Sequence, residues 1–201
     1  MKKRSLMFHK LVRSRMEQPQ IFLPVLILLF FCFLLGSVLG CFIGSGVNEE
    51  ATEIAGLISG NTSVHFSGFL HNFCTAGQYH MVALLAATSI LGVFIIPLLS
   101  FLRGYFLSCT AAAVIVSLPE KGIAAALISC GINALLTVPS LFLLELDAFG
   151  LSMRLKAMSS GKSYYFSNKN IPYHLGVCIV CIIVAAAAEC TLVPFLLSYI
   201  F

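Results

Sequence analysis

Charged residues are scarce in this sequence. They make up 10% of its 201 residues, whereas a soluble domain usually has about 25%. Hydrophobic residues make up 59%, and the mean hydropathy is +0.99. This composition excludes an ordinary soluble domain and predicts a membrane protein. A single membrane domain fills a chain of this length, so no separate soluble domain of ordinary size is expected.

The motifs of common enzyme sites are also missing. The sequence has no H-E-x-x-H zinc motif and no G-x-x-x-x-G-K-[ST] phosphate loop. An intramembrane serine protease needs a base at depth, but all five histidines are predicted to lie in loops or at the edges of spans. Helix packing is a better interpretation of Cys178-x-x-Cys181 than redox or metal chemistry. We therefore predict no enzyme activity, no cofactor and no metal site.

Long runs without charge predict the membrane spans, because a span needs about 20 apolar residues. The stretch 81–119 is too long for one straight span, so a break near Arg103–Gly104 is expected. The prediction is an all-α polytopic helix bundle of about five transmembrane helices. Its spans are at 21–46, 81–102, 104–119, 122–144 and 172–199, its outer loop at 48–80 and its inner loop at 145–170. Helical spacing of apolar residues predicts an amphipathic helix in the second half of the outer loop. The inner loop is expected to start as an extension of the fourth helix.

The basic residues give the expected orientation. With five spans and the N-terminus inside, every Lys and Arg except Lys121 falls on the inner side, Arg103 among them. This agrees with the positive-inside rule, so we predict that the C-terminus is outside. The basic N-terminus beside a span is typical of an orientation signal that contacts anionic lipid, and nucleic acid binding is not expected. The chain is therefore expected to cross a membrane several times, and the family resemblance given below implies that this is a bacterial cell membrane.

Small residues recur at four-residue steps in two predicted spans. Gly36, Gly40 and Gly44 share one face of the first span, and Gly104 and Ser108 begin a similar series in the third. In lipid, such residues let two helix backbones approach closely. Packing within the chain is the favoured interpretation, and self-association into a homo-oligomer through the glycine face is the alternative.

Two polar residues are predicted near the middle of the membrane. Glu189 is the only charged residue between 171 and 201, and Asn133 lies at the centre of the fourth span. One interpretation is a hydrogen bond between helices that fixes their packing. The other is an ion or proton pathway, because charged residues at depth are costly and often functional. The first is favoured, because one acid and one amide do not make a relay.

Four short segments resemble the stage II sporulation protein M family of bacterial membrane proteins. They are a Phe/Asn element in the outer loop, a basic-glycine-aromatic segment, a polar turn, and an apolar run with a proline. In this sequence they read FLHNF (Phe69–Phe73), FLRGYFLS (Phe101–Ser108), SLPEKG (Ser117–Gly122) and TVPSLFLLE (Thr137–Glu145).

The resemblance implies a non-enzymatic scaffold. In that family, the sporulation member is implicated in engulfment and is thought to hold two peptidoglycan-degrading partners. Here it implies that peptidoglycan hydrolases would contact the outer face, with Phe69, Asn72 and Phe73 as candidate contact residues. The turn Arg103–Gly104–Tyr105 is implied only as a structural feature. A small transporter or channel subunit that uses Glu189 and Asn133 is the alternative function.

Overall fold

The described part of the chain is entirely helical in its regular structure. A computed structural model describes residues 2–46, 66–118, 120–161 and 171–200. The elements are α1 (Lys2–Gly44), α3 (Phe66–Ala87), α4 (Gly92–Ser117), α5 (Gly122–Ala126), the π-helical turn η1 (Leu127–Gly131), α6 (Ile132–Ser159) and α7 (Ile171–Ile200). The prediction of an all-α polytopic helix bundle is confirmed.

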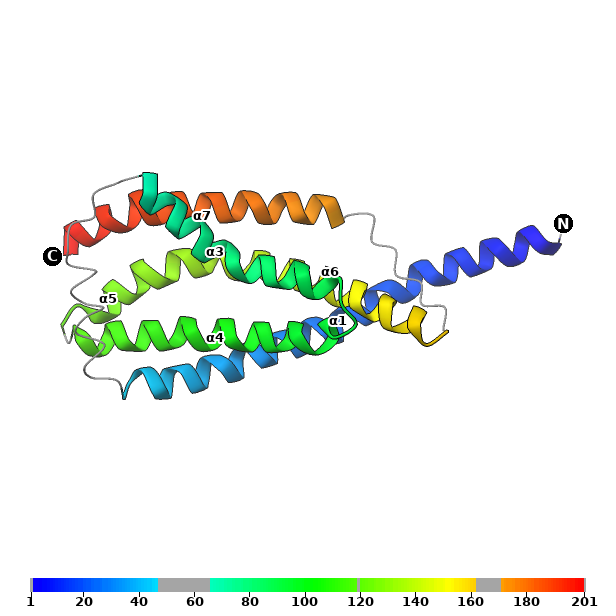
Figure 1. Ribbon diagram of the computed structural model, residues 1–201, viewed down its shortest axis with the longest axis horizontal. Coiled ribbons are helices and arrows are strands. Elements are labelled where there is room, and N and C mark those ends of the chain that lie inside the picture. Colours follow the sequence, from blue (N-terminus) through cyan, green and yellow to red (C-terminus); the bar gives the residue numbers. More distant parts are fainter. Residues whose placement is uncertain (1, 47–65, 119, 162–170, 201) are drawn as a thin grey trace.

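The helices lie side by side and alternate in direction along the chain (Figure 1). α5, η1 and α6 follow one another without a break and form one long helical segment. The N- and C-termini lie at opposite ends of the bundle (Figure 1). Four helical segments are long and apolar enough to cross a membrane, namely Leu23–Gly44, Gly92–Ser117, Gly122–Ser159 and Ile171–Tyr199. α3 packs among them as a fifth helix, against α4, α6 and α7.

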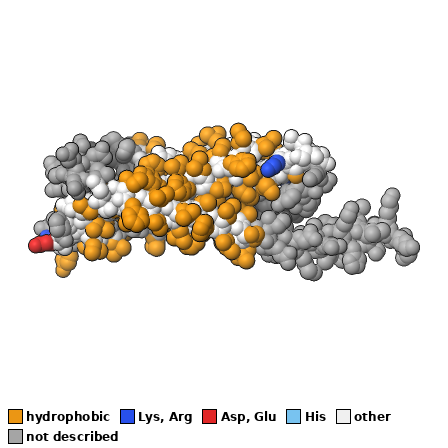
Figure 2. Space-filling view, turned by 90° about the horizontal axis from the view of Figure 1, so that it is seen from below, with side chains coloured by type: hydrophobic (Ala, Val, Ile, Leu, Met, Phe, Trp, Pro, Cys, Tyr) orange, Lys and Arg blue, Asp and Glu red, His pale blue; other side chains and the backbone are white. Residues whose placement is uncertain are grey.

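Side-chain distribution agrees with a bundle surrounded by lipid. On the face in Figure 2, hydrophobic side chains cover most of the described surface, and the charged side chains visible there lie near the two ends. The described part of α1 is apolar on its outward side, where Phe42 is 74% exposed. Because a bilayer has a hydrocarbon layer between two polar layers, this pattern supports a multi-pass membrane protein.

The predicted break at Arg103–Gly104 is wrong. α4 runs through both residues, and the chain instead turns between Ala87 and Gly92. In this turn the Gly92 N–H donates to the Ser89 carbonyl at 3.1 Å. The predicted spans 81–102 and 104–119 are therefore replaced by α3 and α4. Arg103 does not interrupt α4 because its side chain finds polar partners inside the bundle, which are described below.

Parts of both predicted loops are helical, as expected. α6 continues to Ser159, so the first part of the predicted inner loop extends the fourth helix. Gly161, at φ 66°, follows the helix and allows the chain to turn. At the other end, residues 66–80 of the predicted outer loop belong to α3. The remaining parts of both loops, 48–65 and 162–170, lie outside the described residues.

The glycines of α1 pack against the backbone of α4. A Cβ added at Gly36 would lie 2.0 Å from the Phe101 carbonyl oxygen, and one added at Gly40 would lie 2.2 Å from that of Tyr105. At Gly44 the nearest atom would be the Cys109 carbonyl oxygen, at 2.4 Å. The glycine face of α1 is thus covered by α4 of the same chain, which is the favoured interpretation of its spacing.

On α4, Gly104 makes the corresponding close approach to α1. A Cβ there would lie 2.2 Å from the Phe33 carbonyl oxygen of α1. Ser108, one turn further along α4, is half-buried. The two helices run in the same direction (Figure 1), so matching small residues meet along their length.

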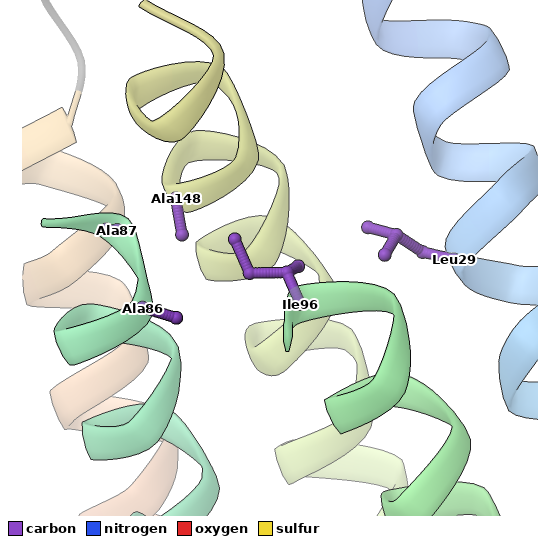
Figure 3. Close-up of a cluster of buried hydrophobic side chains, with 5 residues drawn as sticks. All are labelled: Leu29, Ala86, Ala87, Ile96 and Ala148. Carbon is purple, nitrogen blue, oxygen red and sulfur yellow. The ribbon is translucent and has the colours of Figure 1, made fainter. Parts of the chain in front are cut away.

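A small buried cluster joins four helices near one end of the bundle (Figure 3). Ile96 of α4 lies among Leu29 of α1, Ala86 and Ala87 of α3, and Ala148 of α6. At the same end, the Ser152 hydroxyl of α6 donates to the Ala86 carbonyl at 3.1 Å. These contacts hold the turn between α3 and α4 against α6, which positions the polar residues of all three helices.

Candidate functional site inside the bundle

Glu189 and Asn133 meet inside the bundle. The side-chain amide of Asn133, on α6, donates a hydrogen bond to Glu189 Oε1, on α7. Both side chains are half-buried. The contact joins two neighbouring helices within their membrane-spanning segments. The structure therefore brings together the two residues that the sequence singled out at depth.

Arg103 adds a positive charge to this region. The sequence had predicted that this residue lies on the inner side of the membrane. Its side chain is 9% exposed, and its guanidinium donates to Thr137 Oγ1 at 2.8 Å. The guanidinium also lies over the Tyr79 ring of α3, 4.9 Å from the ring centroid. Arg103 and Glu189 interact electrostatically but form no direct ion pair among the described residues. Arg103 thus connects α4 with α3 and α6, and its charge is felt at α7.

Thr137 completes the connection. Its hydroxyl accepts from Arg103 and donates to the Asn133 carbonyl at 2.9 Å. Asn133 in turn binds Glu189. We call Tyr79, Arg103, Asn133, Thr137 and Glu189 the charged cluster. Its members come from α3, α4, α6 and α7, so it ties together four helices of the bundle.

The π-helical turn η1 lies next to the charged cluster. The turn occupies Leu127–Gly131, directly before the helix that carries Asn133, and it contacts α4 and α7. In a π-helical turn the backbone hydrogen bonds join residues five apart instead of four, and such turns often occur at functional sites. The backbone irregularity and the charged cluster therefore coincide in space.

A second set of polar contacts lies on α6 after the charged cluster. Glu145 is 0% exposed and accepts a hydrogen bond from the Ser100 hydroxyl of α4. Further along, His174 Nδ1 of α7 lies 2.7 Å from Asp147 Oδ2. The sequence analysis assigned Glu145 and Asp147 to an inner loop. Both lie on its helical first part, α6, as expected, but they are buried within the bundle, which the sequence did not predict.

His80 is likewise inside the bundle. It is 4% exposed, and its Nε2 lies 3.0 Å from the Ser140 hydroxyl of α6. The prediction that every histidine lies in a loop or at a span edge is therefore wrong for this residue. Cys178 contacts the same part of α6, where its thiol donates to the Ser140 carbonyl at 3.1 Å. This contact is the packing role that was favoured for the C-x-x-C segment.

The candidate partner-contact residues lie on a helix, as their spacing predicted. Phe69 and Phe73 are half-buried on the first turns of α3, with ring centroids 6.4 Å apart. The side-chain amide of Asn72 lies 3.6 Å from the Cys190 sulfur of α7. All three therefore take part in the start of α3, and Asn72 connects it to α7.

The described polar residues form pairs across helices rather than a metal site. No group of three or more His, Cys, Asp or Glu side chains that could hold a metal ion occurs among the described residues. The geometry instead favours fixing of helix positions or movement of charge through the bundle. No protein-family model, curated protein or solved structure matches this chain.

Proposed function

We propose that this chain is a non-enzymatic scaffold of a bacterial cell membrane that positions peptidoglycan-degrading enzymes during engulfment. The proposal extends the resemblance to the stage II sporulation protein M family. The observation that supports it best is the position of the segment FLRGYFLS (Phe101–Ser108) in the helix bundle. This segment lies in the middle of α4, where α4 meets the other helices.

Arg103, Gly104 and Tyr105 are helical residues of α4 and not the expected turn, but each has a packing role. Arg103 contacts Thr137 of α6 and Tyr79 of α3. Gly104 packs against the backbone of α1, and the backbone of Tyr105 fits against Gly40. A segment that assembles the bundle is expected to be shared by proteins with the same architecture. The packing roles of Arg103, Gly104 and Tyr105 therefore support a resemblance in architecture. A scaffold depends on its architecture rather than on catalytic residues.

The end of the bundle that holds the C-terminus is the proposed contact surface for the hydrolases. With the N-terminus inside, this end faces outward (Figure 1). Near the end of α7, Phe195 is 72% exposed and Tyr199 is 91% exposed. Asn72 supports this end from within, since it contacts α7. In this proposal the exposed aromatic residues touch the partner, and Phe69, Asn72 and Phe73 hold the surface in place.

The test is a purification from detergent-solubilised membranes of sporulating cells, with bound peptidoglycan-degrading activity as the readout. The unaltered chain should recover that activity, and a Phe195→Ala/Tyr199→Ala double variant should recover much less. Tyr173→Ala is the matched control, because Tyr173 is 71% exposed at the other end of α7. Equal recovery by the double variant would overturn the proposed surface. Absence of hydrolase activity from the unaltered chain would overturn the scaffold.

The charged cluster favours a second candidate, a small transporter or channel subunit. A transporter is expected to have several convergent polar residues at depth. The sequence predicted only Glu189 and Asn133 at depth, and the structure adds Arg103 and Tyr79 to them. The test is ion or proton flux in proteoliposomes, which Glu189→Gln should abolish. Equal flux through the unaltered chain and this variant, when both are folded, would contradict this candidate.

A further inference from the structure

Glu145 is a buried carboxyl with few partners. Its side chain is 0% exposed. One oxygen, Oε2, accepts from the Ser100 hydroxyl, and the other, Oε1, has no hydrogen-bond partner. A buried carboxylate needs a counter-charge or several donors, because removal of its charge from water is very costly. One hydroxyl donor does not meet that need.

Among the described residues, no positive side chain forms an ion pair with Glu145. On α4, the Arg103 guanidinium bonds to Thr137 and lies over the Tyr79 ring. On α3, His80 is bonded to Ser140. The part of α1 within the bundle, residues 23–44, contains no charged residue.

Two further titratable side chains also bond to each other. Asp147 Oδ2, on α6 itself, lies 2.7 Å from His174 Nδ1 of α7. Among the described residues, the Ser100 hydroxyl is therefore the only hydrogen-bond partner of Glu145, and no ion pair joins it to a cation.

Glu189 is in the opposite situation. It accepts from Asn133 and interacts with the positive charge of Arg103. An ionised carboxylate is favoured where a cation and a donor face it, and a neutral carboxylic acid where neither a cation nor enough donors are present. The neutral form is thus expected to be favoured more strongly at Glu145 than at Glu189.

We propose that Glu145 is a proton-binding site, held as a neutral carboxylic acid in the contact between α4 and α6. The proton resides on Oε1, the oxygen that lacks a partner, while Oε2 accepts from Ser100. Loss of this proton would place an unpaired charge between two packed helices. The contact between α4 and α6 therefore depends on the bound proton. This inference does not rest on the scaffold proposal or on transport by Glu189.

The experiment is infrared spectroscopy of the full chain in lipid nanodiscs, at neutral pH, in H2O and D2O. A protonated carboxyl gives a carbonyl band that is separate from carboxylate and amide bands and shifts in D2O. The unaltered chain should show this band. Glu145→Gln should remove it, and the matched control Glu189→Gln should retain it. A band that is absent from the unaltered chain, or that only Glu189→Gln removes, would overturn the proposal.

Ser100→Ala keeps the test decisive if Glu145→Gln does not fold. This variant retains the acid but removes its hydrogen-bond donor, so the carbonyl band should remain and move to higher frequency. An unchanged band in Ser100→Ala would show that the protonated carboxyl belongs to another residue, and the proposal would then be wrong.

Discussion

The contact between α1 and α4 gives the sharpest prediction, because the helix backbones approach closely there. In Gly40→Ala, the new methyl group would lie 2.2 Å from the carbonyl oxygen of Tyr105. A backbone oxygen cannot rotate away as a side chain can, so the two helices must separate. Overpacking of a well-packed contact typically costs about 1–3 kcal/mol. We expect Gly40→Ala to lower the free energy of unfolding by an amount in the upper half of that range.

The matched control is Gly176→Ala, because a Cβ at Gly176 meets nothing within 4 Å. Both variants replace glycine by alanine within a helix, so both gain the same helix propensity, about 1 kcal/mol in water. The measurement is unfolding of the purified protein in mixed micelles by increasing the fraction of a denaturing detergent, followed by circular dichroism. If Gly40→Ala and Gly176→Ala unfold at the same detergent fraction, the close contact between α1 and α4 is refuted.

The polar contacts and the chain ends lead to three more predictions. Arg103→Gln and Glu189→Gln should show a coupling of about 0.5–3 kcal/mol in a double-mutant cycle, because each removes the other's counter-charge; purely additive losses would argue against the charged cluster. Ser152→Ala should cost about 0.5–1.5 kcal/mol, because the Ala86 carbonyl loses the Ser152 donor and keeps only the Ser89 N–H, and an unchanged unfolding curve would contradict that bond. A phosphatase reporter, active only outside the cytoplasm, should be active at the C-terminus and inactive after Ser160; the reverse would exclude an inside N-terminus.

Local sequence patterns were sufficient to predict the first and the last membrane span. The predicted spans 21–46 and 172–199 agree closely with Leu23–Gly44 and Ile171–Tyr199, because uninterrupted apolar runs need no partner to be recognised. The spacing of small residues on α1 likewise marked the face that contacts α4. Both features repeat within a few turns of helix, so a short stretch of sequence contains the whole signal.

The interior polar residues could not be located in that way, because their partners are distant in the sequence. In a hydropathy profile Arg103 resembles the boundary of a span. Its partner Thr137 is 34 residues later in the sequence. Glu145 resembles the start of a polar loop, but Ser100 lies 45 residues before it. A hydropathy window registers the cost of a charge and not the partners that offset it. For this reason the sequence predicted a helix break at Arg103, whereas in the structure the neighbouring helices pack around that residue.

The chain order of these partners has a consequence for assembly. α4 carries Arg103, and α6 and α7, which supply Thr137 and Glu189, follow it in the chain. When α4 is made, only Tyr79 on the preceding helix is present to face the guanidinium. An arginine at the centre of a helix costs about 2.5–3.5 kcal/mol on insertion scales. α4 therefore gains its full stability in the membrane only after α6 and α7 have packed against it, which makes the charged cluster a link between insertion and folding.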